Sequence, residues 1–161
     1  YRGQADAWNA VTPSVSIGRQ LREPEAIAAV RQGVKAVVDL TGEFSEARAF
    51  RRLPYLSLPI LDLTAPGPQQ LRTAIDFINL HRAAGTVYVH CKIGYSRSAA
   101  VVGAWLLDAG LAATPGEAVA MLRAVRPKLV VRPEAFAALQ AFHDRDSVMP
   151  KPVRSLVEVR A

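Results

Sequence analysis

The stretch Thr86-Val87-Tyr88-Val89-His90-Cys91-Lys92-Ile93-Gly94-Tyr95-Ser96-Arg97-Ser98 decides the fold of this chain. Its first four residues are β-branched or aromatic and follow Gly85, so they predict a strand. Residues 99–107 are apolar and helix-forming, which predicts a helix after the loop. A strand, a tight loop and a helix N-terminus together form a cradle for an anion, because backbone N–H groups converge there.

Two side chains of this loop indicate which reaction the anion-binding cradle supports. Cys91 is the only cysteine of the chain, and Arg97 stands at the sixth position after it. The sulfur would lie at the floor of the cradle, where a helix N-terminus and an arginine favour the thiolate. The planar guanidinium can bind two oxygens of a tetrahedral oxyanion at once. Because a thiolate beneath a bound phosphate can attack phosphorus, the segment predicts a phosphate-ester hydrolase with a cysteinyl-phosphate intermediate.

The stretch His90–Ser98 resembles the His-Cys-x5-Arg-Ser/Thr signature of the cysteine-dependent protein tyrosine phosphatase superfamily. Its ending, Gly94–Ser98, is most similar to the dual-specificity branch. Arg126-Pro127 is similar to an Arg-Pro segment of that branch, and Arg132–Phe136 to its Pro-Asn-x-Gly-Phe segment without the asparagine and glycine. The order of elements over about residues 14–143 is similar too, which implies the compact dual-specificity domain.

These observations assign catalytic roles to four residues. Cys91 is the expected nucleophile, and Arg97 is expected to hold the phosphate oxygens in the ground and transition states. Ser98 would donate a hydrogen bond to the sulfur and ease its departure, although it also fits a helix-capping serine. The leaving oxygen needs a proton, and Asp62, in a proline-rich loop after a strand, resembles the acid of the family in position and type.

The other loop residues are expected to bind or support the phosphate. The phosphate-binding set is Lys92, Ile93, Gly94, Tyr95, Ser96 and Arg97, and the supporting residue is His90, which orients the loop or is simply packed. Asp39 and Glu43 are weaker candidates for the acid because they follow a different strand. No metal or organic cofactor is implied, since thiolate, guanidinium and backbone amides supply the electrostatics.

Helix and strand signals alternate in the first half of the chain, and helices dominate the second half. Strands are predicted at 14–17, 35–40, 55–58 and 86–89, and helices at 24–31, 69–84 and in three segments after the loop, the last at 133–144. This order predicts an α/β fold with a central, mainly parallel sheet flanked by helices and the loop at the carboxyl end of a strand. We expect a single domain over 1–161, with a core at about 14–146 and a tail at 147–161.

Composition limits the cell compartment and the partners. The 161 residues are 50% hydrophobic and 21% charged, which is typical of a folded globular protein. A single cysteine excludes an intramolecular disulfide and favours a reducing compartment such as the cytoplasm. No signal peptide is visible, and the longest apolar stretch, 99–107, is too short to span a bilayer. The chain begins at Tyr1 rather than Met, so a membrane-attached parent chain remains open.

The net charge of +6 favours acidic partners. Basic residues cluster at Arg48, Arg51 and Arg52 and in the tail at Lys151, Arg154 and Arg160, a pattern that also fits a solvated surface. With 7% aromatic residues and no recognised motif, nucleic acid is not expected as a partner. We expect a monomer that acts on a phosphorylated protein or an anionic phospholipid, with contact to a membrane surface in the second case.

The leading hypothesis is a dual-specificity-like protein phosphatase for phosphotyrosine, with phosphoserine and phosphothreonine as further substrates. The alternative keeps the chemistry and takes a phosphoinositide or another phospholipid. Lys92 favours the lipid hypothesis, because lipid-directed relatives often carry lysine after the cysteine, whereas the uncharged Tyr95 favours the protein hypothesis. A catalytically silent phosphate-binding module fits less well, because Cys91, Arg97 and Asp62 are all present. A rhodanese-type sulfur transferase also fits poorly, because the His-Cys pair and the Arg-Ser pair are not its pattern.

Overall fold

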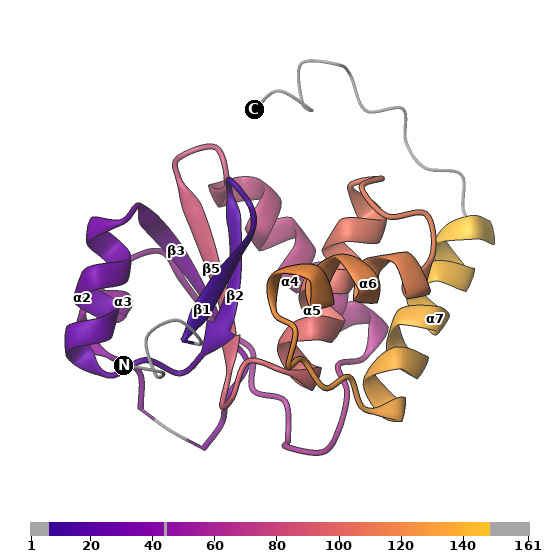
Figure 1. Cartoon of the computed structure of the whole chain (residues 1–161), viewed down its shortest axis with the longest axis horizontal. Coiled ribbons are helices and arrows are strands. Elements are labelled where there is room, and N and C mark those ends of the chain that lie inside the picture. The colour runs from indigo at the N-terminus through magenta and orange to yellow at the C-terminus, as the bar shows by residue number, and fades with distance from the viewer. Residues whose placement is uncertain (1–6, 44, 149–161) are drawn as a thin grey trace.

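The computed structural model describes residues 7–43 and 45–148. The strands form one sheet in the order β1-β2-β5-β3-β4 (Figure 1). Their bounds are β1 (Trp8–Thr12), β2 (Val15–Arg19), β3 (Val34–Asp39), β4 (Tyr55–Ser57) and β5 (Thr86–Cys91). The helices are α2 (Glu23–Arg31), α3 (Arg48–Arg51), α4 (Pro68–His81), α5 (Ser96–Asp108), α6 (Pro115–Val125) and α7 (Pro133–Val148). The predicted α/β class with a mainly parallel sheet is confirmed.

The valine-rich strands occupy the middle of the sheet. β5 lies between β2 and β3 and runs parallel to both, and β4 pairs in parallel with β3. Both faces of such a central strand are covered, which is why β3 and β5 consist of nearly continuous apolar runs rather than alternating ones. The carboxyl ends of these four strands therefore lie along one edge of the sheet, with Arg19 opposite Cys91 and Asp39 opposite His90.

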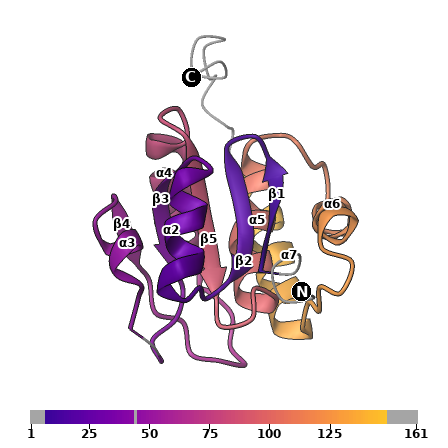
Figure 2. The ribbon, with the colours of Figure 1, turned by 60° about the vertical axis from the view of Figure 1, so that its left-hand side comes forward.

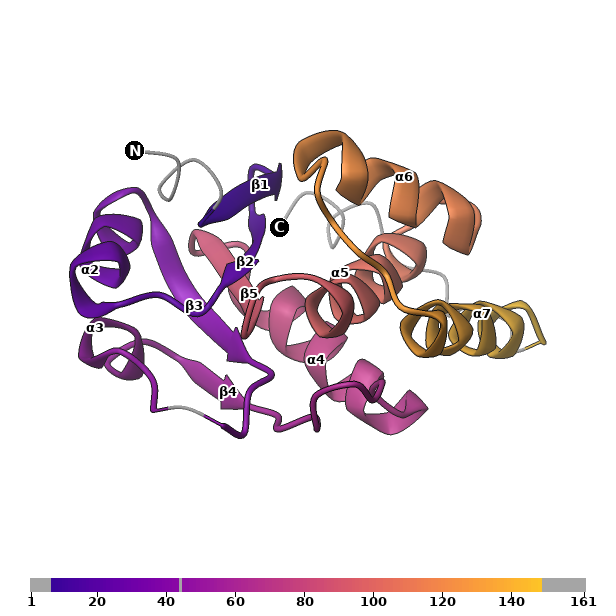
Figure 3. The same ribbon diagram turned by 60° about the horizontal axis from the view of Figure 1, so that its bottom comes forward.

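Helices cover the two faces unequally, as Figures 2 and 3 show. On one face, α2 and α3 close a small core that includes Phe50, Val37 and Tyr88. On the other face, α4, α5, α6 and α7 build the larger core, in which the apolar α5 is buried along almost its whole length. The sheet is thus the middle layer, and α5 begins immediately after the loop that ends β5.

Three boundaries differ from the prediction. The sheet and the core begin before Ser14, because β1 pairs antiparallel with β2 and Ala7 is fully buried. Helix α4 ends at His81 rather than Ala84. Helix α7 continues to Val148, so residues 147 and 148 are not a tail, and Lys151, Arg154 and Arg160 lie outside the described residues. Within the described ranges, no helix has the length and apolarity needed to cross a membrane.

Candidate active site

The loop after β5 is held in a conformation that requires glycine. Gly94 has φ of 74°, a left-handed conformation that L side chains rarely adopt. A Cβ at this position would come within 2.3 Å of the Gly18 backbone carbon at the end of β2. Gln20 N–H also donates to the carbonyl of Lys92 over 3.1 Å. The turn after β2 therefore supports the loop from one side and fixes its curvature.

The alternation of β5 sends the two signature side chains to opposite faces. Cys91 belongs to the core below α5 and is only 2% exposed. His90 points to the face of α2 and α3, where its ring lies 5.6 Å from that of Tyr88 and 6.5 Å from that of Phe50. There its Nε2 is 2.5 Å from Oε2 of Glu46. His90 is thus tied to an acidic partner, and it is not merely packed.

Behind His90 lies a buried polar network. Asp39 accepts hydrogen bonds from the backbone N–H and hydroxyl of Thr41 and from the Tyr55 hydroxyl. Burial, with Asp39 and Glu46 close by, raises the pKa of Tyr55 far above its usual value, so that Tyr55 remains a donor. Asp39 was a weaker candidate for the acid, and the structure places it in this network instead.

The same network contains the described residues that could hold a metal ion. Asp39, Glu46 and His90 each offer one ligand atom, all within 4.8 Å of one another. Their oxygens and the Nε2 already have partners in Thr41, Tyr55 and the backbone N–H of Ala47, or in one another. The potential ligand atoms of Asp39, Glu46 and His90 are therefore all engaged in hydrogen bonds within the protein, and the three residues form a support for the loop.

Arg97 lies in the first turn of α5 and connects three segments. Its side chain is almost buried, and Nη1 donates to Oε1 of Glu43 at 2.7 Å and to the carbonyl of Ile60 at 2.8 Å. Its Nη2 lies 3.6 Å from Oδ1 of Asp62. The predicted acid and the predicted arginine are thus brought together, although 35 positions separate them (97 − 62). Asp62 itself is well exposed, on a loop open to solvent.

The two serines of the loop have different environments. The Ser96 hydroxyl donates to the carbonyl of Val130 and accepts from the Arg132 N–H, so this side chain fixes the loop to the segment before α7. The Ser98 hydroxyl is fully buried and has no hydrogen-bond partner among the described residues. The hydrogen bond from Ser98 to the Cys91 sulfur, which the sequence predicts, is therefore not formed in this structure.

Arg126 is the main support that the sequence analysis did not assign. Its Nε donates to the carbonyl of Gly94 and its Nη2 to the carbonyl of Ile93, each over 3.0 Å. Nη1 donates to Oδ1 of Asn9 on β1, and the guanidinium carbon lies 5.5 Å from the centre of the Tyr95 ring. Because these carbonyls are held outward by Arg126, the N–H groups of the loop can face an anion. The Arg126-Pro127 pair was noted in the sequence without a role.

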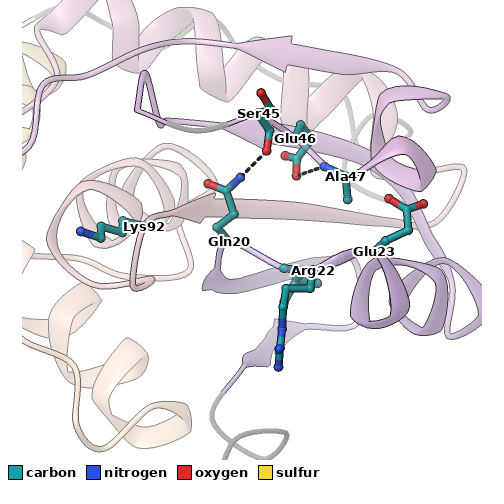
Figure 4. Close-up of a pocket in the computed structure, with 8 residues that line it drawn as sticks. Gln20, Arg22, Glu23, Ser45, Glu46, Ala47 and Lys92 are labelled. Atoms are coloured by element: carbon teal, nitrogen blue, oxygen red, sulfur yellow. Dashed lines mark hydrogen bonds between the residues drawn. The ribbon is translucent and has the colours of Figure 1, made fainter.

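The rim of the site is charged and carries a cavity. Lys92 and Ile93 follow Cys91 and are exposed. Beside Lys92, a cavity of about 450 Å³ lies between the β2–α2 turn and the segment before α3 (Figure 4). Gln20 lies in it between Lys92 and Ser45 and donates to the carbonyl of Ser45 at 2.8 Å. Arg22 and Glu23 close the other side.

Comparison with known proteins agrees with this geometry. The family model of the dual specificity phosphatase catalytic domain matches residues 21–145. The chain belongs to this family. It is a cysteine-type phosphatase, and the predicted superfamily and branch are confirmed.

The names of individual relatives include lipid and protein phosphatases, and the name of the human relative includes both. The chain is 29% identical over 153 residues to phosphatidylglycerophosphatase and protein-tyrosine phosphatase 1 of Homo sapiens, covering 88% of this chain and 76% of the relative. It is 29% identical over 121 residues to the tyrosine-protein phosphatase CDC14 homolog of Schizosaccharomyces pombe, covering 72% of this chain and 22% of the relative. A crystal structure of Tk-PTP in the active form is 29% identical with a TM-score of 0.77, covering 86% of this chain and 97% of that chain.

Proposed function

We propose that this dual-specificity-family phosphatase removes the phosphate of a phosphoglycerol or related headgroup from an anionic glycerophospholipid. The observation that supports the chemistry best is the meeting of Arg97 with Asp62 at the mouth of the loop that begins with Cys91. In the first step the Cys91 thiolate attacks phosphorus, and an S–P bond forms as the P–O bond to the leaving oxygen breaks. Asp62, in its acid form, gives its proton to that oxygen.

The second step returns the enzyme to its starting state. The Asp62 carboxylate takes a proton from water, the hydroxide attacks phosphorus, and the S–P bond breaks to release inorganic phosphate and the thiolate. From its place in the family signature, we assign Ser98 the role of donor to the departing sulfur. Glu43 accepts a hydrogen bond from Nη1 of Arg97, and we assign it a positioning role rather than that of the acid.

Two observations favour a lipid headgroup. Lys92 places an ammonium at the rim, beside a cavity that has room for the part of a substrate beyond its phosphate. The human relative, whose name includes phosphatidylglycerophosphatase beside protein-tyrosine phosphatase, aligns over 88% of this chain. Polar and charged residues are among those that line that cavity, such as Gln20, Ser45 and Glu23.

The second candidate is the protein phosphatase that was our leading interpretation of the sequence. It rests on the uncharged Tyr95 in the loop and on the similarity to the CDC14 homolog. In this case the cavity beside Lys92 would take residues that flank a phosphotyrosine. The two candidates use the same chemistry and differ only in the leaving group.

A phosphate-release assay separates them. Wild type and Cys91→Ser would be compared on phosphatidylglycerophosphate, on phosphoinositides and on phosphotyrosine and phosphoserine peptides. We expect the highest kcat/KM on phosphatidylglycerophosphate and no turnover by Cys91→Ser on any substrate. A kcat/KM at least tenfold higher on a phosphopeptide would support the protein phosphatase, whereas turnover by Cys91→Ser would overturn the shared mechanism.

A further inference from the structure

Exposed apolar side chains gather at the mouth of the active site. Eight large hydrophobic residues are well exposed among the described residues, and four of them lie along the carboxyl edge of the sheet. Two belong to the acid loop, Leu61 at 78% and Leu63 at 60% exposure. The other two are Ile93 in the catalytic loop and Val130, whose carbonyl is bonded to Ser96. Figure 3 views the molecule from this edge.

The acid loop has a turn that directs Asp62 and the leucines differently. The backbone N–H and the hydroxyl of Thr64 both bond to the carbonyl of Leu61 and close the turn. Asp62 lies beside Arg97, while the leucines before and after it remain in solvent. The turn therefore separates a catalytic carboxylate from two apolar side chains that contribute little to the core.

Leu63 stands at a position that favours a different residue. Its φ is 64°, and it is the only residue besides glycine with positive φ in the described ranges. Glycine and asparagine adopt this conformation with less strain than leucine. An exposed leucine in a left-handed conformation is thus doubly unfavourable for the isolated fold. Strain of this kind concentrates at functional sites, where another contact compensates for it.

We propose that Leu61 and Leu63 insert into the surface of an anionic lipid bilayer and bring the catalytic mouth onto it. Exposed basic residues adjoin the other two apolar residues of the mouth, because Lys92 precedes Ile93 and because Lys128 and Arg132 stand on either side of Val130 in the sequence. This charge fits an anionic surface. Apolar side chains next to basic ones are the composition of an interfacial anchor. The inference deepens the proposed function, since a phospholipid substrate presents its phosphate at the same surface.

Binding to vesicles tests the inference without any reaction. The vesicles contain phosphatidylcholine with phosphatidylglycerol, which carries no phosphate monoester. The test variant is Leu61→Gln with Leu63→Asn, because asparagine tolerates the left-handed turn. The control is Leu80→Gln, which removes an equally exposed leucine (74%) at the far end of α4, near the opposite edge of the sheet. We expect co-flotation to fall at least about tenfold in the double variant and to stay unchanged in the control.

Activity on matched substrates separates docking from catalysis. The double variant should keep wild-type activity on a monomeric short-chain phosphatidylglycerophosphate and lose about tenfold on the long-chain lipid in vesicles. Equal losses on both substrates would overturn the inference, because the substitutions would then have disturbed Asp62. If the double variant bound vesicles as well as wild type does, the inference would also be overturned, even if the wild-type protein hydrolyses the lipid. A selective loss on phosphopeptides would assign the leucines to a protein partner and overturn it as well. If wild type binds these vesicles through the leucines yet hydrolyses only phosphopeptides, the docking stands and the proposed substrate falls.

Discussion

The two sides of the catalytic loop are built in opposite ways. Behind the loop, His90, Glu46, Asp39 and Tyr55 form a buried network in which each polar atom of the carboxylates has a partner. In front of it, the acid loop is exposed, and Asp62 reaches Arg97 only at 3.6 Å. The difference shows which part must be fixed before substrate arrives and which part must stay open to admit it.

Arg126 and Arg97 have different roles on the two sides of the catalytic loop. Arg126 holds the loop carbonyls from a nearly buried position, so it sets the shape of the anion cradle. Arg97 faces the open side, where its guanidinium contacts the carboxylates of Glu43 and Asp62. If this comparison is correct, substitutions on the fixed side lower stability and activity together, whereas substitutions on the open side lower activity alone.

The largest effect is expected from Arg126→Met, on the fixed side. It leaves the carbonyls of Gly94 and Ile93 without their donor, and each buried acceptor left unsatisfied costs about 1–3 kcal/mol. Urea unfolding would measure this loss, together with a large fall in kcat. Arg123→Met, at a solvent-exposed position of α6, is the control. Full activity and stability in Arg126→Met would show that the cradle does not depend on this support.

Asp62→Asn tests the open side. The variant should lose about 10²- to 10³-fold in kcat on alkyl phosphates, whose leaving oxygens need a proton, and far less on p-nitrophenyl phosphate. Its urea midpoint should equal that of wild type because the side chain is exposed. The measurement is kcat across a series of phosphate esters with leaving groups of rising pKa. A loss that does not vary across the series would remove Asp62 from the role of general acid.

Glu46→Gln sharpens the comparison on the buried side. The neutral amide keeps the shape of the side chain but replaces a charge-assisted hydrogen bond to His90, so we expect about 2 kcal/mol of destabilisation. The kcat should fall in parallel, with no dependence on the leaving group. Glu134→Gln, which alters an exposed ion pair with Arg132, should change neither quantity. Dependence on the leaving group in Glu46→Gln would mean that the network takes part in proton transfer.

The smallest effect concerns Glu25, which supports the turn after β2. Its hydrogen bond with Arg19, at 2.6 Å, lowers the pKa of the carboxyl group. A lowered folded-state pKa means that the unfolded chain binds the proton more readily, so this contribution to stability is lost as pH falls through that lowered value. Glu25→Gln should cost about 1 kcal/mol at pH 7 and flatten the acid side of the stability profile. Urea midpoints over acidic pH measure this, and an unaltered profile would contradict it.

The catalytic loop was predictable from the sequence because its parts are contiguous. Cys91, Gly94, Arg97 and Ser98 all lie within residues 91–98, and the valine runs of β3 and β5 predict buried strands directly. The supports come from distant segments, since Glu46 lies 44 positions before His90 and Arg126 lies 32 after Gly94. The spacing of apolar residues in the sequence does not predict such contacts, because they depend on the order of the strands in the sheet and on the face toward which each side chain points.

The edge strand β1 and the exposed leucines of the acid loop also could not be predicted from the sequence. Trp8–Thr12 is a short, half-buried strand without a clear apolar alternation, and it becomes visible only through its pairing with β2. Leu61 and Leu63 read in the sequence as ordinary apolar residues flanking Asp62. Their exposure and the left-handed φ of Leu63 depend on the turn that Thr64 closes. These features therefore require the three-dimensional structure.

The most direct test of the central claim is to capture the intermediate on Cys91. Wild type and Asp62→Asn would be mixed with phosphotyrosine or phosphatidylglycerophosphate and quenched in acid within the first turnover, and the Cys91 peptide examined by mass spectrometry. The account predicts one phosphate on this peptide in both proteins. Cys91→Ser should show no turnover, and the first-turnover burst of product should equal the enzyme concentration. Rapid turnover by wild type without any phosphorylated Cys91 peptide would contradict the account.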